Sequence, residues 1–424
     1  MRNCTPQRLL SLLGRSGTLA RIARDQSGAI GFTVGLMSTA ILGVTGLTID
    51  VGDWYMTKRS MQEAADAAAI GGATQLWANG TNSQAISAGT SDAKLNGFST
   101  TNAATVNVTV SAQTVTATIQ KSADMMFSAL FLNSAPTIMV SAQAGLLPGG
   151  APACLLTTSQ NTPGALTING SGSVSASGCA VVTDSTSSTA LSAVGSETVT
   201  TQEICGPGGS SIGNATFTPA PSSCAALPDP LANLTPPSNI NDPCQYNNAS
   251  YSQNATLSPG VYCGGITISG HPTITFQSGV YILRNGPLKA TGTGTLNGTG
   301  VGFYLTGTGT QVQLAKDDLS LSGNVTVNLS APTSGPLSGI AFYEDHSAPT
   351  GDVTSTINGN TSVNIDGILY FGNQNLVING TDDVQFTAIV GNTVTLNGNY
   401  TFKLGMQTVP PPPSLSLPRV ALTQ

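Results

Sequence analysis

The sequence predicts a mainly β protein with an N-terminal transmembrane helix, a small α+β module and then a right-handed parallel β-helix-like solenoid. One long uncharged run near the N-terminus can cross a bilayer. Glycine-led apolar triplets recur in the second half of the chain at a period near 20 residues. Charged residues are only 8% of the chain, against roughly 25% in ordinary soluble domains. Salt-bridged helices therefore cannot dominate the fold.

Charge is divided unevenly along the chain. Residues 1–24 contain five arginines and no acid, whereas the residues after Asp25 contain nine Lys or Arg and nineteen Asp or Glu. An acidic domain of this kind is unsuited to binding nucleic acid phosphates, so we exclude nucleic acid as a partner. Residues 1–25 are expected to form a basic cytoplasmic leader, because cationic flanks of a membrane span resist translocation.

The 24 residues between Asp25 and Asp50 carry no charge. At about 1.5 Å per residue, a helix of this length crosses a ~30 Å hydrocarbon core. We therefore assign residues 26–50 to a transmembrane helix. The run exceeds the about 7 to 15 apolar residues of a secretory signal and lacks a small-x-small cleavage site, so we expect it to remain as an anchor. The rest of the chain then lies outside the cytoplasm.

Cysteine usage agrees with an extracytoplasmic location. Six cysteines follow the span, an even number in an oxidising compartment, and none of them lies at the C-x-x-C spacing of a zinc or redox site. Fifteen pairings of six cysteines are open. The disulfide candidates are Cys154, Cys179, Cys205, Cys224, Cys244 and Cys263.

Residues 51–147 are predicted to form a small α+β module. Small and apolar residues recur there first at the three- and four-residue steps of a helix, and then at every second position, as in a strand. In order, we predict a continuing helix over 53–77, a Gly- and Ser-rich linker over 81–100, a β-hairpin over 104–119 turning at 111–113, a short apolar helix over 124–132 and a strand over 137–147.

Residues 152–405 carry the repeat. The tyrosines of the glycine-led triplets are 19 and 23 residues apart from Tyr262 to Tyr304, and the next gap, 39 residues, fits two steps. Asn-Gly pairs supply residues for tight corners. Connections this short favour a parallel solenoid over a β-sandwich or immunoglobulin-like domains, the main rivals. We expect a Pro- and Cys-rich excursion at about 206–259 and an extended Pro-rich tail over 406–424.

The N-terminal segment SGAIGFTVGLMSTAILGVTGLTIDVGDWYMTKRSMQEAADAAAIGGA resembles that of the Tad-type (Flp) pilus-assembly TadG-like family. The features that match are a glycine before the span, an aspartate that closes it and an alanine-rich helix after it, although Glu63 interrupts that helix motif. The motif residues are Gly28, Asp50, Gln62, Ala65, Asp66 and Ala69. The β-rich second half is similar to a repeat region carried by some of these proteins.

The resemblance implies a membrane-anchored structural or accessory component of pilus assembly or adhesion. Its location would be the bacterial inner membrane, single-pass, with the N-terminus cytoplasmic and the bulk periplasmic. Its partners would be other Tad pilus-assembly membrane proteins or pseudopilin-like subunits. Some relatives resemble integrin-type proteins that have a metal-dependent adhesion site, and residues 184–188 are superficially similar to the Asp-x-Ser-x-Ser loop of that site. We expect no metal there, because the alternating α/β pattern that would hold the other ligands is missing.

An enzyme is the contrasting hypothesis, because parallel β-helices can cleave polysaccharides. Glycoside hydrolysis needs two carboxylates facing one cleft, and the candidate acids are adjacent pairs whose side chains point to opposite faces of a strand. The pairs are Asp317 with Asp318, Glu344 with Asp345, and Asp382 with Asp383. His271 and His346 have no partner at metal-ligand spacing. We expect no catalytic, cofactor-binding or metal-binding residues; the alternative is a carbohydrate-binding or polysaccharide-cleaving surface protein in contact with glycans.

Overall fold

The computed structural model describes residues 27–100, 103–147, 149–308, 318–351, 353–359, 362–380, 383–405 and 416–423. The predicted basic leader, Asp317, Asp382 and the Pro-rich stretch 406–415 lie outside these ranges. The chain divides into two compact units. The first contains residues up to 69 with 89–109 and 116–142, and the second contains 70–88, 110–115 and the residues from 143 onward.

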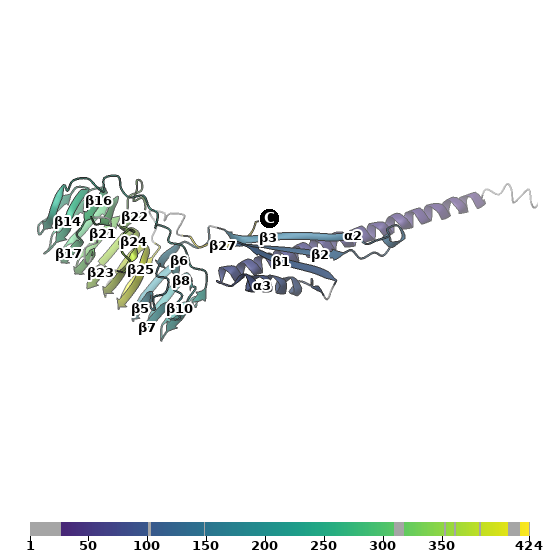
Figure 1. Ribbon diagram of the computed structural model, residues 1–424, viewed down its shortest axis with the longest axis horizontal. Helices are drawn as coiled ribbons and strands as arrows, with labels where there is room; N and C mark the ends of the chain where they lie inside the picture. The colour runs from purple at the N-terminus through teal and green to yellow at the C-terminus, as the bar shows by residue number, and fades with distance from the viewer. Residues whose placement is uncertain are drawn as a thin grey trace, which may run out of the picture. The chain divides into compact units, whose positions relative to one another are not determined.

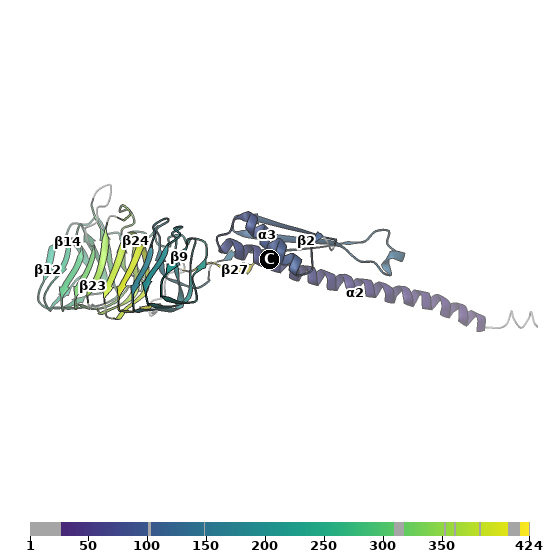
Figure 2. The same ribbon diagram turned by 90° about the horizontal axis from the view of Figure 1, so that it is seen from below.

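The first element is one unbroken helix, α2 (Ser27–Trp77), which Figure 2 shows as a continuous rod. It confirms the long apolar helix predicted from the sequence, and by length and composition it can cross a membrane. Its sequence contains no proline. The Thr45 and Thr48 hydroxyls donate to the carbonyl oxygens of Ile41 and Val44, at 2.8 and 2.7 Å. Hydroxyls within the apolar stretch are thereby satisfied inside the helix itself.

A second helix, α3 (Asn82–Leu95), occupies the segment predicted to be a linker, so that prediction is wrong. The Thr81 N–H donates to Gln84 Oε1 at 2.8 Å, and the Gln84 N–H donates to Thr81 Oγ1 at 3.3 Å. This reciprocal capping box starts the helix. Gly97, with φ of +89°, follows its C-terminal end. The small polar residues of this segment are typical of a linker, and the prediction followed that composition rather than the capping box formed by Thr81 and Gln84.

Four strands form a small sheet in the order β1-β2-β3-β27: β1 (Ala104–Ser111), β2 (Thr114–Ser122), β3 (Thr137–Leu147) and β27 (Arg419–Leu422) (Figure 1). The predicted hairpin and the predicted strand over 137–147 are confirmed. Strand β27 pairs antiparallel with β3, with Arg419 opposite Leu147. Residues 419–422 are therefore a sheet strand rather than part of an extended tail.

The predicted helix over 124–132 is wrong. Only the three-residue 3-10 helix η2 (Ser128–Leu130) forms there. The amides of Met126 and Phe127 donate to a side chain of α2 instead of to helical carbonyl oxygens, as described below.

The second sheet contains 23 strands, and all its described pairings are parallel. Its strands up to residue 223 are β4 (Ala153–Thr157), β5 (Leu166–Gly170), β6 (Ser173–Thr183), β7 (Leu191–Gly195), β8 (Thr198–Gly206), β9 (Ser210–Ile212), β10 (Thr216–Thr218) and β11 (Ser222–Ser223). Those up to residue 306 are β12 (Tyr246–Tyr251), β13 (Ala255–Leu257), β14 (Gly260–Ile268), β15 (Thr273–Phe276), β16 (Gly279–Arg284), β17 (Leu288–Gly292), β18 (Thr295–Thr299) and β19 (Val301–Thr306). The remainder are β20 (Leu319–Gly323), β21 (Thr326–Ser330), β22 (Ile340–Glu344), β23 (Thr354–Gly359), β24 (Ser362–Gly380), β25 (Asp383–Gly398) and β26 (Thr401–Leu404).

Register in this parallel domain follows a step near 20 residues from β14 to β19. Gly260 pairs with Tyr281, and Gly279 pairs with Val301. The expectation that the gap between Tyr304 and Tyr343 spans two steps is wrong, because these two tyrosines pair directly. The 39-residue gap is therefore one step with inserted loops, not two steps.

The long strands β14 and β24 each pair with different neighbours along their lengths. As a result, β14, β16, β19, β22, β24, β23, β20 and β17 form a closed ring of pairings. The prediction of a right-handed β-helix-like solenoid is corrected accordingly: the sheet is a closed eight-stranded parallel barrel, to which the other strands add in parallel. The reason is that β14 and β24 continue through corners where the prediction placed turns.

The chain enters the parallel domain in the middle of its strand order. Leu155 of β4 pairs with Ile389 of β25, so the first strands of the domain lie beside its last ones. Figure 1 shows β6 and β8 on one side of the yellow β25, and β14 and β16 on the other. No strand is assigned over 224–245, where the chain passes from β11 to β12.

Corners between strands are built from Asn-Gly pairs. The Asn397 side-chain amide donates to Asn379 Oδ1 at 2.7 Å, and that of Asn379 donates to Asn358 Oδ1 at 2.7 Å. Gly398, the residue after Asn397, has φ of +116° and pairs with Gly380. A Cβ at Gly398 would lie 2.1 Å from the Gly380 carbonyl oxygen. The stacked corners thus require glycine for both conformation and space.

Replacing Gly398 by alanine should lower the free energy of unfolding by about 3 kcal/mol or more, because strain and a backbone clash add. The matched control is Gly335→Ala. Gly335 also has positive φ, at +84°, but no atom lies within 4 Å of the added Cβ. Its cost should be about 1 kcal/mol. Chemical denaturation of the purified chain, followed by circular dichroism, would measure both; equal losses would contradict the stacked-corner interpretation.

Candidate functional site

Asp50, the acid that closes the uncharged run, binds a distant loop rather than solvent. Its side chain is buried, and its Oδ2 accepts the backbone N–H groups of Met126, Phe127 and Ser128 at 3.1, 2.9 and 2.6 Å. The Ser128 hydroxyl donates to the same oxygen at 2.5 Å. One carboxylate oxygen therefore receives four hydrogen bonds, which fix residues 124–132, hereafter the apolar loop, to α2.

Glycines of α2 allow the apolar loop to approach the helix closely. A Cβ at Gly46 would lie 2.6 Å from Phe127 Cγ, and a Cβ at Gly43 would lie 3.7 Å from Phe131 Cζ. An apolar groove runs between the helix and the loop, lined by side chains that include Leu42, Ile49 and Leu130 as well as the two phenylalanines. Larger residues at Gly46 would displace the loop.

Polar contacts hold the start of the apolar loop. The indole N–H of Trp54 donates to the Asp124 carbonyl oxygen at 2.7 Å. Lys121 Nζ lies 3.0 Å from Asp124 Oδ2. Because Trp54 lies four residues beyond Asp50, these contacts stand about 6 Å further along the helix axis than the Asp50 contacts.

The remaining motif residues mostly serve packing within the module. Ala65 and Ala69 are fully buried, so they do not offer an exposed docking surface. The Gln62 side-chain amide donates to Asp66 Oδ1 at 2.8 Å and to the Ser141 carbonyl oxygen at 3.2 Å. Gly28 lies in the first turns of α2. The motif thus includes two residues, Asp50 and Gln62, that connect α2 to later segments, and two buried alanines that pack within the module.

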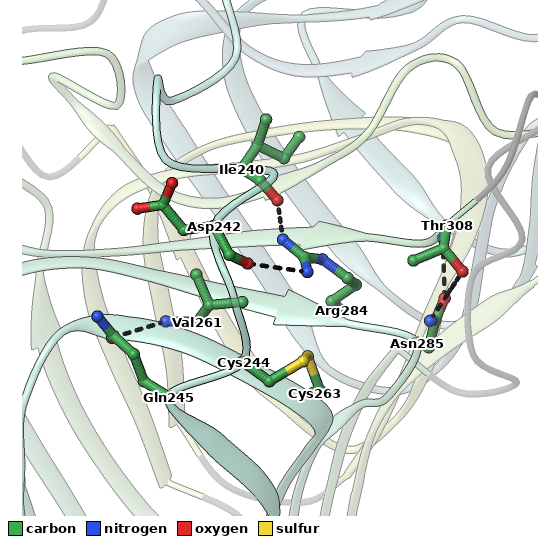
Figure 3. The surroundings of a disulfide bond; sticks show 9 residues. All are labelled: Ile240, Asp242, Cys244, Gln245, Val261, Cys263, Arg284, Asn285 and Thr308. Carbon is green, nitrogen blue, oxygen red and sulfur yellow. Dashed lines mark hydrogen bonds between the residues drawn. A yellow bond between two sulfur atoms is a disulfide. The ribbon is translucent and has the colours of Figure 1, made fainter.

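All six cysteines beyond the span form disulfides: Cys154–Cys179, Cys205–Cys224 and Cys244–Cys263. The last two flank residues 225–243, hereafter the strap. Near Cys244–Cys263, the Arg284 guanidinium donates to the carbonyl oxygens of Ile240 and Asp242 (Figure 3). One of the few cations of the domain is thereby used to hold the strap down.

The strap follows the strand order of the parallel domain. The Leu227 N–H donates to Asp184 Oδ1 at 2.8 Å, just after β6. The Tyr370 hydroxyl of β24 donates to Asp229 Oδ2 at 2.7 Å, and the Tyr343 hydroxyl of β22 donates to the Leu231 carbonyl oxygen at 2.9 Å. With Arg284 of β16, these contacts follow the order of paired strands. The strap lies within the Pro- and Cys-rich excursion that the sequence predicts at about residues 206–259.

The candidate carboxylate pairs do not form an open cleft in the described part of the chain. Asp318 and Glu344 are each 2% exposed. Burial, followed by the neighbouring Asp318 carboxyl, raises the pKa of Glu344 well above its usual range. Asp345 accepts the Thr306 hydroxyl at 2.7 Å, and Asp383 lies 3.7 Å from Lys403 Nζ.

His346 lies beside two side chains, and His271 contacts one. His346 Nδ1 lies 2.7 Å from the Tyr370 hydroxyl and 3.7 Å from Asp229 Oδ2. His271 contacts the Thr293 hydroxyl. Within the described ranges, no three His, Cys, Asp or Glu residues are grouped as metal ligands would be. Asp184 is the first residue of segment 184–188, which is superficially similar to a metal-dependent adhesion site. Its side chain is buried and accepts the Leu227 N–H of the strap.

Sequence reasoning found Asp50 but missed its partners. Ser128 and Gly46 carry no pattern of their own, and the apolar loop read as a helix because its apolar residues are consecutive. The shortness of this apolar segment, between two predicted strands, was the available signal. The strap was missed because its contacts join residues up to 141 positions apart.

Replacing Asp50 by alanine should release the apolar loop. Hydrogen bonds to a charged group contribute about 1.5–3 kcal/mol each, so exchange of the Met126, Phe127 and Ser128 amides should accelerate roughly tenfold or more. Hydrogen–deuterium exchange of the detergent-solubilised chain measures this. Asp53→Ala, an exposed acid one turn away, is the control; unchanged protection in the Asp50 variant would refute the assigned role.

The parallel domain should lose stability as pH rises from about 4 to about 7. Burial, opposed by the Leu227 N–H and reinforced by the Asp229 charge, raises the pKa of Asp184 from 3.8 to about 7. The folded state then binds more protons than the unfolded state in this range, so the free energy of unfolding falls with pH. Denaturation midpoints of Asp184→Asn should fall less steeply with pH than those of Asp242→Asn, an exposed strap residue. Identical slopes would contradict this.

Comparison with known proteins adds one match. Residues 28–75 match the Tad family model, described as Flp pilus-assembly TadE/G-like. The matched segment lies within α2 and includes the motif residues from Gly28 to Ala69. No match was found among curated proteins or among solved structures.

Proposed function

We propose that this chain is a membrane-anchored, non-catalytic structural or accessory component of the machinery that assembles Flp (Tad) pili or supports their adhesion. The observation that carries the proposal is the TadE/G-like segment at 28–75, which coincides with the apolar helix α2. That family is associated with pilus machinery. The parallel domain is a separate, larger part that the family match does not cover.

An extracytoplasmic location is indicated by the apolar helix together with the three disulfides, which persist in oxidising compartments. The finer arrangement belongs to the proposal: the bacterial inner membrane, crossed once, with the N-terminus in the cytoplasm. Five arginines in residues 1–24 support this orientation, because positive flanks stay on the cytoplasmic side.

A non-catalytic role is supported by the burial of the side chains that catalysis or sugar binding would need. Glu344 and Asp318 are buried. Tyr304, Tyr343 and Tyr370 form a stacked row that would suit a sugar ring, but all three side chains are buried, and the strap accepts hydrogen bonds from two of them. The proposal therefore favours a structural part over a glycan-binding or polysaccharide-cleaving protein.

The proposed partners are other Tad membrane proteins or pseudopilin-like subunits. Because the alanines of the motif are buried, contacts with partner proteins would be made by the outer face of α2. Arg59 and Glu63 on that face are 70% and 66% exposed and form an ion pair at 3.3 Å. An exposed pair of this kind contributes little to stability and remains free to exchange partners.

Deleting the gene in its host should abolish or strongly reduce surface Flp pili, because an anchored assembly component would be lost. Electron microscopy would count pili per cell, and the full chain supplied from a plasmid should restore them. A chain in which residues 28–75 are exchanged for an unrelated membrane helix is the matched control and should fail to restore piliation. Normal piliation and adhesion in the deletion strain would refute the proposal.

A further inference from the structure

We propose that the apolar loop, residues 124–132, enters the extracytoplasmic leaflet of the bilayer beside α2, so that lipid acyl chains are the ligand of its exposed side chains. This inference rests on the membrane anchoring in the proposed function. It adds a second membrane contact to the one provided by the helix.

Exposed apolar side chains are concentrated in this loop. Five of its nine residues are exposed and large: Met126, Phe127, Leu130, Phe131 and Leu132, at 78, 39, 80, 66 and 40%. Twelve others lie on α2 between Phe32 and Met56, and the rest of the described exposed large apolar side chains are scattered singly. A contiguous patch of this kind marks an interaction surface.

The depth of the loop follows from its contacts with the helix. Phe127 packs at Gly46 and Phe131 at Gly43, four and seven residues before Asp50. At 1.5 Å per residue, these positions lie about 6 and 10 Å inside the end of the uncharged run. Interfacial segments bury their apolar faces about 5–10 Å into the headgroup and acyl boundary. The loop therefore reaches acyl depth if α2 crosses the membrane.

Six backbone amides of the loop are satisfied within the protein, as an apolar environment demands. The amides of residues 126–128 donate to Asp50. Those of Leu130, Phe131 and Leu132 donate to carbonyl oxygens within the loop, at 3.1, 2.9 and 2.8 Å. Unsatisfied amides in hydrocarbon cost several kcal/mol each. The Asp50 carboxylate is thus what makes a non-helical segment compatible with lipid.

Polar and amphipathic groups mark the water side of the loop. Asp124 is its only charged residue, and it pairs with Lys121 at 3.0 Å. The Trp54 indole donates to the Asp124 carbonyl oxygen. Tryptophan is enriched at membrane interfaces, where one part of the ring is apolar and the other is wet. The loop is therefore polar at its start and apolar where it contacts Gly43 and Gly46.

Lipid is favoured over a protein partner because the groove beside the loop shares its walls with the membrane span. Leu36, Val44 and Leu47 line its continuation together with Phe131. These residues belong to the uncharged run that acyl chains would surround. A protein covering the loop would also have to displace lipid from the helix.

Tryptophan quenching in proteoliposomes tests the inference. Leu130 and Leu95 are equally exposed, at 80 and 81%, and each would be replaced by tryptophan in the full chain. Leu42→Trp, within α2, reports whether the helix itself is inserted. Phosphatidylcholine with brominated acyl chains quenches tryptophan in the hydrocarbon region, and acrylamide quenches it in water. The emission of the native Trp54 and Trp77 is subtracted with the parent chain.

We expect brominated lipid to remove most of the emission added by Leu130→Trp and Leu42→Trp, and acrylamide to quench only Leu95→Trp. Quenching of Leu42→Trp by lipid, with Leu130→Trp quenched by acrylamide, would overturn the inference and leave the anchor intact. Failure of lipid to quench Leu42→Trp would overturn both. In the unsubstituted chain, a lipid-borne photoactivated diazirine should label residues 126–132; absence of label there would also overturn the inference.

Discussion

With few charges available, this protein uses hydrogen bonds far more than ion pairs to satisfy its buried polar groups, and that constraint shapes each of its parts. In α2 the threonine hydroxyls return to the helix backbone. In the apolar loop a single carboxylate, Asp50, takes up three amides and a hydroxyl. In the parallel domain, neighbouring strands supply the partners, and asparagine side chains extend the pairing into the corners. These bonds matter because burying a polar group without a hydrogen-bond partner costs free energy.

The sequence was informative where periodicity is local and uninformative where contacts are distant. Alternation located the hairpin and β3, and the uncharged run located α2. It failed at α3, where a capping box was outweighed by composition, and at the apolar loop, where a run of apolar residues has no helical partner. It also took the barrel for a solenoid, since nothing local shows that β14 and β24 continue through corners. Asp50 could be named from its position, but its role needed residues 126–128.

The division between anchor and parallel domain has a functional meaning. The TadE/G-like match covers α2 and stops before the first strand. The likeness to the TadE/G-like family therefore lies in α2, and the parallel domain lies outside the matched residues. Entry at β4 and exit after β26 are adjacent, because β26 pairs with β6 and β25 with β4. A domain joined in this way can be placed on a shared anchor without interrupting it.

The strap has a consequence for how such proteins can vary. Repeats that contact only their neighbours can be added or lost without effect on distant ones. Here the strap is bonded to the strands at both of its ends, through Cys205–Cys224 and Cys244–Cys263. One additional strand between β6 and β16 would lengthen this order of paired strands by about 4.8 Å, and the strap contacts beyond it would then face a different strand. The number of paired strands and the strap sequence must therefore change together, so this domain cannot gain a strand there without a matching change in the strap.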